Sequence, residues 1–211
     1  MTTTEKLIES IVQDTASVEP ASHPYLLSAK WLAASVAYLA LSLAYSGVRP
    51  DLMLKLQSPL FIAELILLAG IIVTTSLSAA LLAFPDVHQK RRMIYSPVLM
   101  TALFVLVMVL SWNANTHPSH LSGHSVQCLM FIASLTLLPA AWMLYVMRSL
   151  ASTHPHLAGS IALLSAFSIG ALSLRLSEQT DSIMHVMQWH YLPMIAVGLI
   201  GLGLGKLLLK W

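Results

Sequence analysis

The chain has 211 residues, of which 57% are hydrophobic and only 9% are charged, and its mean hydropathy is +0.76. Soluble domains carry about 25% charged residues, so this composition excludes an ordinary soluble globular protein. The net charge of +2 gives no basis for direct nucleic-acid binding, and the single cysteine, Cys128, excludes a disulfide within the chain.

The chain begins with residues that predict a short amphipathic helix. Thr2-Thr3-Thr4-Glu5 has the spacing of a capping box. Four apolar residues follow at helical spacing, and they are Leu7, Ile8, Ile11 and Val12. Because isolated helices shorter than about 12–15 residues are marginal in water, something must cover this stripe. The alternatives are the membrane surface, the cytoplasmic loops of the protein and a partner protein, and we favour the partner.

Six apolar stretches follow. A hydrocarbon core of about 30 Å is crossed by about 20 helical residues. The stretches are Ala29–Tyr45, Leu60–Phe84, Ser96–Trp112, Gln127–Met147, Leu157–Leu176 and Met187–Leu209. We therefore predict an all-α integral membrane bundle, with residues 1–27 as a cytoplasmic N-terminal segment and residues 28–211 as a six-span transmembrane domain.

The distribution of Lys and Arg predicts the orientation. If the N-terminus is cytoplasmic, the cytoplasmic side holds Lys6, Lys30, Lys90, Arg91, Arg92, Arg148, Lys206 and Lys210. The outer side then holds only Arg49, Lys55 and Arg175. This asymmetry follows the positive-inside rule, so both termini are expected in the cytoplasm. Residues 1–27 lack the short apolar region of a signal peptide.

Glu64 is the only carboxylate within a predicted span. Ionisable residues inside a bilayer are functional candidates by default. Glu64 is expected either to pair locally, with Arg49, Lys55 or a buried hydroxyl, or to have a sensing or ion-linked role.

The loop between spans three and four carries His117, His120 and His124, and Cys128 follows it. These residue types are metal ligands, but Pro118 argues against an unbroken helix that would align them. The three histidines are therefore either polar loop residues or a weak metal site. Cys128 is either a packing residue or a sensing thiol. No catalytic triad or zinc-protease helix is present in the sequence, so we predict neither an enzyme nor a cofactor.

Spans five and six are rich in small residues, among them Gly159, Gly201 and Gly205. Small residues let helix backbones approach closely in lipid. The two interpretations are internal packing of these spans and a homodimer face.

Motifs along nearly the whole chain resemble the NrsF family, which are negative regulators, or membrane-bound anti-sigma factors, of extracytoplasmic-function sigma factors in bacteria. The motifs are Thr4-Glu5 with Leu7, Ile8 and Val12; Gly47-Val-Arg49-Pro50-Asp51-Leu52; Pro59, Phe61 and Glu64; Phe84-Pro85-Asp86; Cys128, Pro139 and Arg148; His156-Leu157-Ala158-Gly159; Asp181-Ser182; Trp189-His190-Tyr191; and the terminal Leu209-Lys210-Trp211.

The resemblance implies a multi-pass protein of the bacterial inner membrane that sequesters a sigma factor and releases it on an envelope, metal or oxidative stress signal. We predict that the apolar stripe of the N-terminal helix binds the sigma factor, with further contacts from Lys90-Arg91-Arg92. The alternative function is a small membrane redox or metal-binding protein that uses the outer histidines and Cys128.

The chain departs from the family at one place. Members commonly carry a second cysteine in the outer loop between spans five and six, where this sequence has Ser177 or Glu178. A sensor built from two cysteines of one chain is therefore excluded here.

Overall fold

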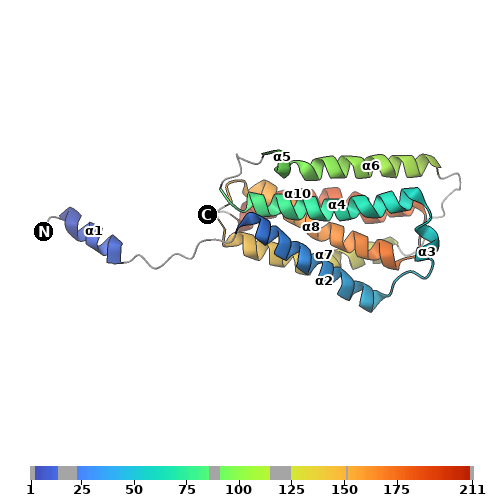
Figure 1. Ribbon diagram of the computed structural model, residues 1–211, viewed down its shortest axis with the longest axis horizontal. Helices are drawn as coiled ribbons and strands as arrows, with labels where there is room; N and C mark the ends of the chain where they lie inside the picture. The colour runs from blue at the N-terminus through green and yellow to red at the C-terminus, as the bar shows by residue number, and fades with distance from the viewer. Residues whose placement is uncertain (1–2, 14–22, 86–90, 115–124, 151, 210–211) are drawn as a thin grey trace.

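A computed structural model describes residues 3–13, 23–85, 91–114, 125–150 and 152–209. Every regular element in these ranges is a helix, and six helices are long and apolar enough to cross a membrane (Figure 1). The prediction of an all-α bundle with six potential spans is therefore confirmed.

The elements follow one another with short connections. They are α1 (Thr3–Gln13), α2 (Pro24–Ser46), α3 (Leu52–Lys55), α4 (Pro59–Leu82), α5 (Arg91–Ile94), α6 (Ser96–Ala114), α7 (Ser125–Arg148), α8 (Pro155–Ser177), α9 (Ile183–His185), the π-helical segment η2 (Val186–Tyr191) and α10 (Leu192–Leu208). The sixth span combines the last three of these and runs from Ile183 to Leu208.

Prolines determine where several spans begin. Pro24, Pro59 and Pro155 occupy the first turns of α2, α4 and α8, where a missing N–H costs nothing. Pro193, near the start of α10, cannot donate to the carbonyl four residues earlier. Just before it, the N–H of Leu192 donates to the carbonyl of Met187, five residues back. The sixth span itself begins at Ile183, where the Ser182 side chain accepts from the N–H of His185, so it starts earlier than predicted from hydropathy.

Helix α8 is the centre of the bundle and contacts α2, α4, α7 and α10. Serine hydroxyls join it to two of these neighbours: Ser173 lies 2.7 Å from Ser42 of α2, and Ser165 lies 3.3 Å from Ser76 of α4. Helix α6 lies at one edge of the bundle and packs mainly on α4 (Figure 1).

The glycines of spans five and six lie where α8 and α10 approach most closely. A Cβ atom added to Gly201 would lie 2.6 Å from the Cα of Ser160, which no real side chain tolerates. Gly159 and Gly205 face each other across the same contact, whereas Gly203 has no atom within 4 Å of its Cβ position. The predicted internal packing of spans five and six is confirmed, and the homodimer face stays a prediction.

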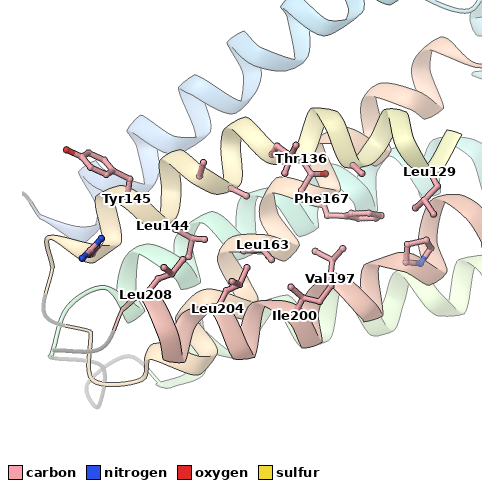
Figure 2. Close-up of a pocket in the computed structure, with 16 residues that line it drawn as sticks. Leu129, Thr136, Leu144, Tyr145, Leu163, Phe167, Val197, Ile200, Leu204 and Leu208 are labelled. Atoms are coloured by element: carbon pink, nitrogen blue, oxygen red, sulfur yellow. The ribbon is translucent and has the colours of Figure 1, made fainter. Parts of the chain in front are cut away.

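An apolar groove of about 590 Å³ lies between α7, α8 and α10 (Figure 2). Leu144, Leu163, Phe167 and Val197 point into it, and Thr136 is one of its few polar residues. A groove of this composition on a spanning face suits contact with lipid chains, because hydrocarbon cannot satisfy polar groups and the groove presents few of them.

Both the start of α2 and the end of α10 lie at one end of the bundle, and residues 47–58 and 178–182 lie at the other (Figure 1). We call the second of these the distal end.

This arrangement, with the charge asymmetry, predicts the topology. A reporter that is active only in the cytoplasm, such as a fluorescent protein, should be active when fused after Trp211. A reporter that is active only in the periplasm, such as alkaline phosphatase, should be active when inserted in 113–125. Alkaline-phosphatase activity of the C-terminal fusion would contradict the topology.

Candidate functional site

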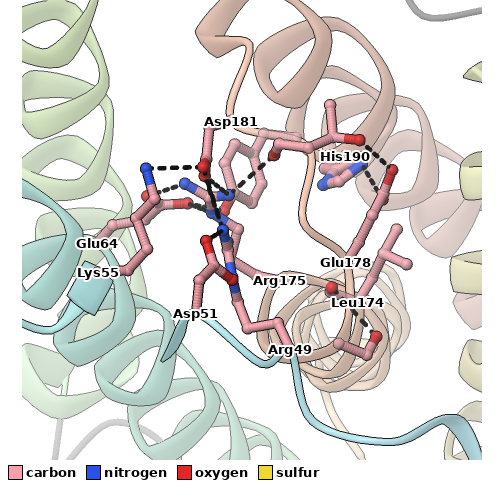
Figure 3. Close-up of polar contacts among 12 residues, drawn as sticks. Arg49, Asp51, Lys55, Glu64, Leu174, Arg175, Glu178, Asp181 and His190 are labelled. Carbon is pink, nitrogen blue, oxygen red and sulfur yellow. Dashed lines mark hydrogen bonds and ion pairs between the residues drawn. The ribbon is translucent and has the colours of Figure 1, made fainter. Parts of the chain in front are cut away.

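The distal end carries a network of charged and polar side chains, which is unusual for a chain with so few charges (Figure 3). Its residues come from the α2–α4 connection, the first turns of α4, the start of α7, the end of α8, the 178–182 loop and the sixth span. The network has two parts, an ion-pair part centred on Asp181 and Glu64 and a thiol–imidazole part centred on Glu178.

Arg49 anchors the α2–α4 connection to α8. Its backbone N–H donates to the carbonyl of Leu176 at 2.9 Å. Its guanidinium, with no exposed side-chain surface, donates to Asp51 through Nε and Nη2, both at 2.8 Å, and to Asp181 at 3.1 Å. Lys55 Nζ lies 2.7 Å from the same Asp181 carboxylate. Asp181 therefore holds two cations from a segment far away in sequence.

These contacts shift the pKa values of the loop residues. The hydrogen bonds and charge of Arg49 hold the pKa of Asp51 below its usual range, and the same bonds raise the pKa of Arg49. Partial burial acts to raise the pKa of Asp181, but the bonds from Lys55 and Arg49 outweigh it, so this pKa is lowered. All three groups are charged at neutral pH.

Glu64 and Arg175 form a buried ion pair between α4 and α8. Arg175 Nε donates to Glu64 Oε1 at 2.7 Å and Nη2 donates to Oε2 at 3.2 Å. The hydroxyl of Tyr191 also donates to Glu64, and the ring of Phe61 lies 4.8 Å from the Arg175 guanidinium carbon. Arg175 further donates to the carbonyl of Thr180 at 3.2 Å. Both charges are thus well satisfied, as burial requires.

Glu64 is thus paired in the structure, and its buried hydroxyl is that of Tyr191; a sensing role for Glu64 stays a prediction. The expected cations are wrong: Arg49 and Lys55 pair with the loop carboxylates, and the cation at Glu64 is Arg175. Arg175 lies 111 residues from Glu64 in sequence, so only the packing of α8 on α4 brings the two together.

A cavity of about 230 Å³ lies beside this ion-pair part, between α4, α6 and the loops. Its polar lining includes Lys55, Glu64, Ser111, Arg175 and Asp181. The two carboxylates and two cations around it are already paired with each other, which leaves little unmatched charge for a ligand.

The thiol–imidazole part surrounds Glu178. Cys128 Sγ, at the start of α7, lies 3.3 Å and 3.4 Å from the two oxygens of Glu178. Thr180 Oγ1 donates to Glu178 at 2.6 Å, and His190 Nε2 lies 3.4 Å from Glu178 Oε2. The His185 and His190 rings are perpendicular, with centroids 5.2 Å apart. One potential ligand atom from each of Cys128, Glu178, His185 and His190 lies within 4.8 Å of the other three.

Glu178 is ionised in this environment. Partial burial raises the pKa of its carboxyl group, but the nearby His190 imidazole and the hydrogen bond from Thr180 outweigh burial and lower this pKa to about 2. The carboxylate accepts from the Cys128 thiol and from Thr180, and it lies beside the His190 imidazole.

The π turn explains why two histidines meet here. His185 ends α9 and His190 lies in η2, five residues later. Residues five apart lie about 140° apart around an α-helix, but an i→i+5 turn places them nearly above one another. Both imidazoles consequently face Glu178.

Of the site residues predicted from the sequence that the structure describes, only Glu64 and Cys128 belong to the distal network, and the others lie elsewhere. Leu7, Ile8 and Val12 are exposed on α1, at 60%, 57% and 65% of their surface. Ile11 lies in the same helix, Arg91 begins α5, and Arg92 is exposed. Lys90, His117, His120 and His124 lie outside the described residues. Cys128 is buried, as a small packing residue would be.

Sequence reasoning missed several residues of the network as functional candidates. They are Glu178, Thr180, Asp181, His185, His190 and Tyr191. One signal was available: the family resemblance implies a second cysteine near Ser177 or Glu178, and Glu178 lies beside Cys128 in the structure.

Comparison with known proteins gives two matches. The profile of the NrsF family, described as negative regulator of sigma F, matches residues 11–211. The anti-sigma-F factor NrsF of Caulobacter vibrioides (strain NA1000 / CB15N) is 29% identical to this chain over 217 residues, which cover 99% of each protein. No solved structure matches the chain significantly.

Proposed function

This chain belongs to the NrsF family of negative regulators of sigma F, and we propose that it is an inner-membrane anti-sigma factor that holds an extracytoplasmic-function sigma factor through helix α1. In this proposal the sigma factor is released when the distal end responds to an envelope, metal or oxidative stress. A family of anti-sigma regulators agrees with the expectation that the protein is not an enzyme.

The exposed apolar stripe of α1 is the observation that carries the proposal. Leu7, Ile8 and Val12 each expose more than half of their surface, while Glu5 and Lys6 begin the polar side of the same short helix. An amphipathic helix with its apolar side uncovered is the usual ligand of a hydrophobic groove in a partner protein.

The free energy of burying its apolar side chains limits how much α1 can contribute to binding the sigma factor. Burying four aliphatic side chains yields a gross gain of roughly 6–12 kcal/mol. Loss of rigid-body freedom and ordering of the helix cancel much of this gain. We therefore propose that the basic residues Lys90, Arg91 and Arg92, on the same side of the membrane as α1 in the predicted topology, supply further contacts to the sigma factor.

The polar network supports a sensing role for the distal end of the bundle. Asp181 and Arg175 join the 178–182 loop to the α2–α4 connection and to α4. A displacement of the 178–182 loop, which also carries Glu178, would act on α2, α4 and α8 through these ion pairs, and α2 is the span that follows α1 in sequence.

The test is a double substitution in the stripe. Leu7→Asp with Ile8→Asp should abolish repression of a sigma-dependent reporter, because each unpaired carboxylate costs several kcal/mol when it is desolvated in a partner groove. Reporter output should rise to the level of a deletion strain. Membrane levels of the protein should not change, because no span is altered.

The control adds the same two charges outside the stripe. Ser10→Asp with Gln13→Asp should repress like the wild type and should co-purify with the sigma factor. Full repression by the stripe variant would show that α1 is not the docking element.

A further inference from the structure

We propose that Cys128, Glu178, His185 and His190 form a binding site for a divalent transition-metal ion of the Zn²⁺ class. The site would join α7, the 178–182 loop and the sixth span at the distal end.

The donor set is built from four side chains that come from three separate segments. One donor atom of each lies within 4.8 Å of the others. A tetrahedral ion with bonds of about 2.0–2.3 Å needs its ligands about 3.3–3.8 Å apart. The Cys128–Glu178 and His190–Glu178 separations, 3.3 Å and 3.4 Å, already match this spacing. Small side-chain rotations would close the remaining gaps.

The buried imidazole of His190, which lacks a hydrogen-bond partner within the described part of the chain, is the observation that points to a ligand. It is 1% exposed, and its Nδ1 atom has no hydrogen-bond partner among the residues that the structure describes. Its Nε2 atom lies near Glu178 without a hydrogen bond to it. A buried polar atom without a partner costs free energy, and a metal ion accepting the Nε2 lone pair would remove part of that cost.

The chemistry of the donors selects the ion. One thiolate, two imidazoles and one carboxylate favour Zn²⁺, Co²⁺ or Cu²⁺ over Mg²⁺ and Ca²⁺, which need oxygen ligands. Cys128 binds as the thiolate, so binding releases the thiol proton to solvent. Thr180, which donates to Glu178 at 2.6 Å, would orient the carboxylate from behind.

Co²⁺ is the probe for the site. Full-length protein purified in detergent is titrated with Co²⁺ and then with Zn²⁺. We expect visible d–d bands of tetrahedral intensity, a near-ultraviolet thiolate-to-Co²⁺ band, and loss of both when equimolar Zn²⁺ is added. Mg²⁺ should displace nothing.

Four variants locate the ligands. Cys128→Ser should lose the thiolate band, and His190→Gln and Glu178→Gln should each weaken Zn²⁺ binding by at least the about 10–100-fold that loss of a supporting group costs. Replacement of His117, His120 and His124 by Ala is the matched control and should bind like the wild type. Gel filtration and thermal unfolding of each apo variant report whether it folds.

The outcomes are distinct. Octahedral Co²⁺ spectra, or an unchanged thiolate band in Cys128→Ser, would overturn the site, and loss of binding in the triple-histidine variant alone would move it to the loop. A role of the metal as release signal rests on the proposed function. It predicts that Zn²⁺ induces the reporter in wild type but not in His190→Gln, and an equal response of both would refute that role while binding stands.

Discussion

Arg175→Met is expected to destabilise the protein by about 3–5 kcal/mol, the cost of leaving one charge of a buried pair without its partner. Glu64 would keep the hydroxyl of Tyr191 but lose both guanidinium bonds, at 2.7 Å and 3.2 Å. The loop would also lose the bond from Arg175 to the carbonyl of Thr180. The free energy of unfolding in mixed detergent–SDS micelles measures the effect.

A double-mutant cycle separates the ion pair from ordinary packing. Glu64→Leu combined with Arg175→Met removes both charges, so the double variant should be more stable than Arg175→Met alone. Arg148→Met is the matched control, because Arg148 is exposed at the opposite end of the bundle, and it should change stability by less than about 0.5 kcal/mol. Equal losses for Arg148→Met and Arg175→Met would contradict the buried pair.

The spans could be predicted from the sequence because a run of about 20 apolar residues is a property of the chain alone. Their ends could not, because they depend on local backbone chemistry. Pro24 starts α2 before its apolar run, and the Ser182 cap starts the sixth span at Ile183, before the apolar run that begins at Met187.

The distal network was only partly predictable for the same reason. Glu64 stands out as a carboxylate in an apolar run, but its partner Arg175 is set by how α8 packs on α4. His185 and His190 do not share a face of an α-helix, so helical periodicity separates them, and only the π turn brings them to Glu178. Cys128 was correctly placed near the end of a span, but its neighbours come from segments about fifty residues away.

The packing of α8 on α10 predicts the second large effect. Gly201→Leu should destabilise the bundle by at least the about 1–3 kcal/mol typical of overpacking. Even its Cβ would lie 2.6 Å from the Cα of Ser160, and a backbone atom cannot rotate away as a side chain can. The two helices would have to separate, and the 2.9 Å bond from Ser160 Oγ to the carbonyl of Gly198 would break. Unfolding in mixed micelles should report the loss.

Gly203→Leu is the matched control, because it adds the same side chain to the same helix at a position with no atom within 4 Å. It should leave stability within about 0.5 kcal/mol of the wild type. The same control tests the homodimer interpretation of the small residues, since Gly203 faces away from α8. If Gly203→Leu converts a dimer to a monomer in gel filtration, the outer face of α10 is a subunit contact. If Gly201→Leu and Gly203→Leu have equal stability, the glycine at position 201 is not needed for the close contact of α8 with α10.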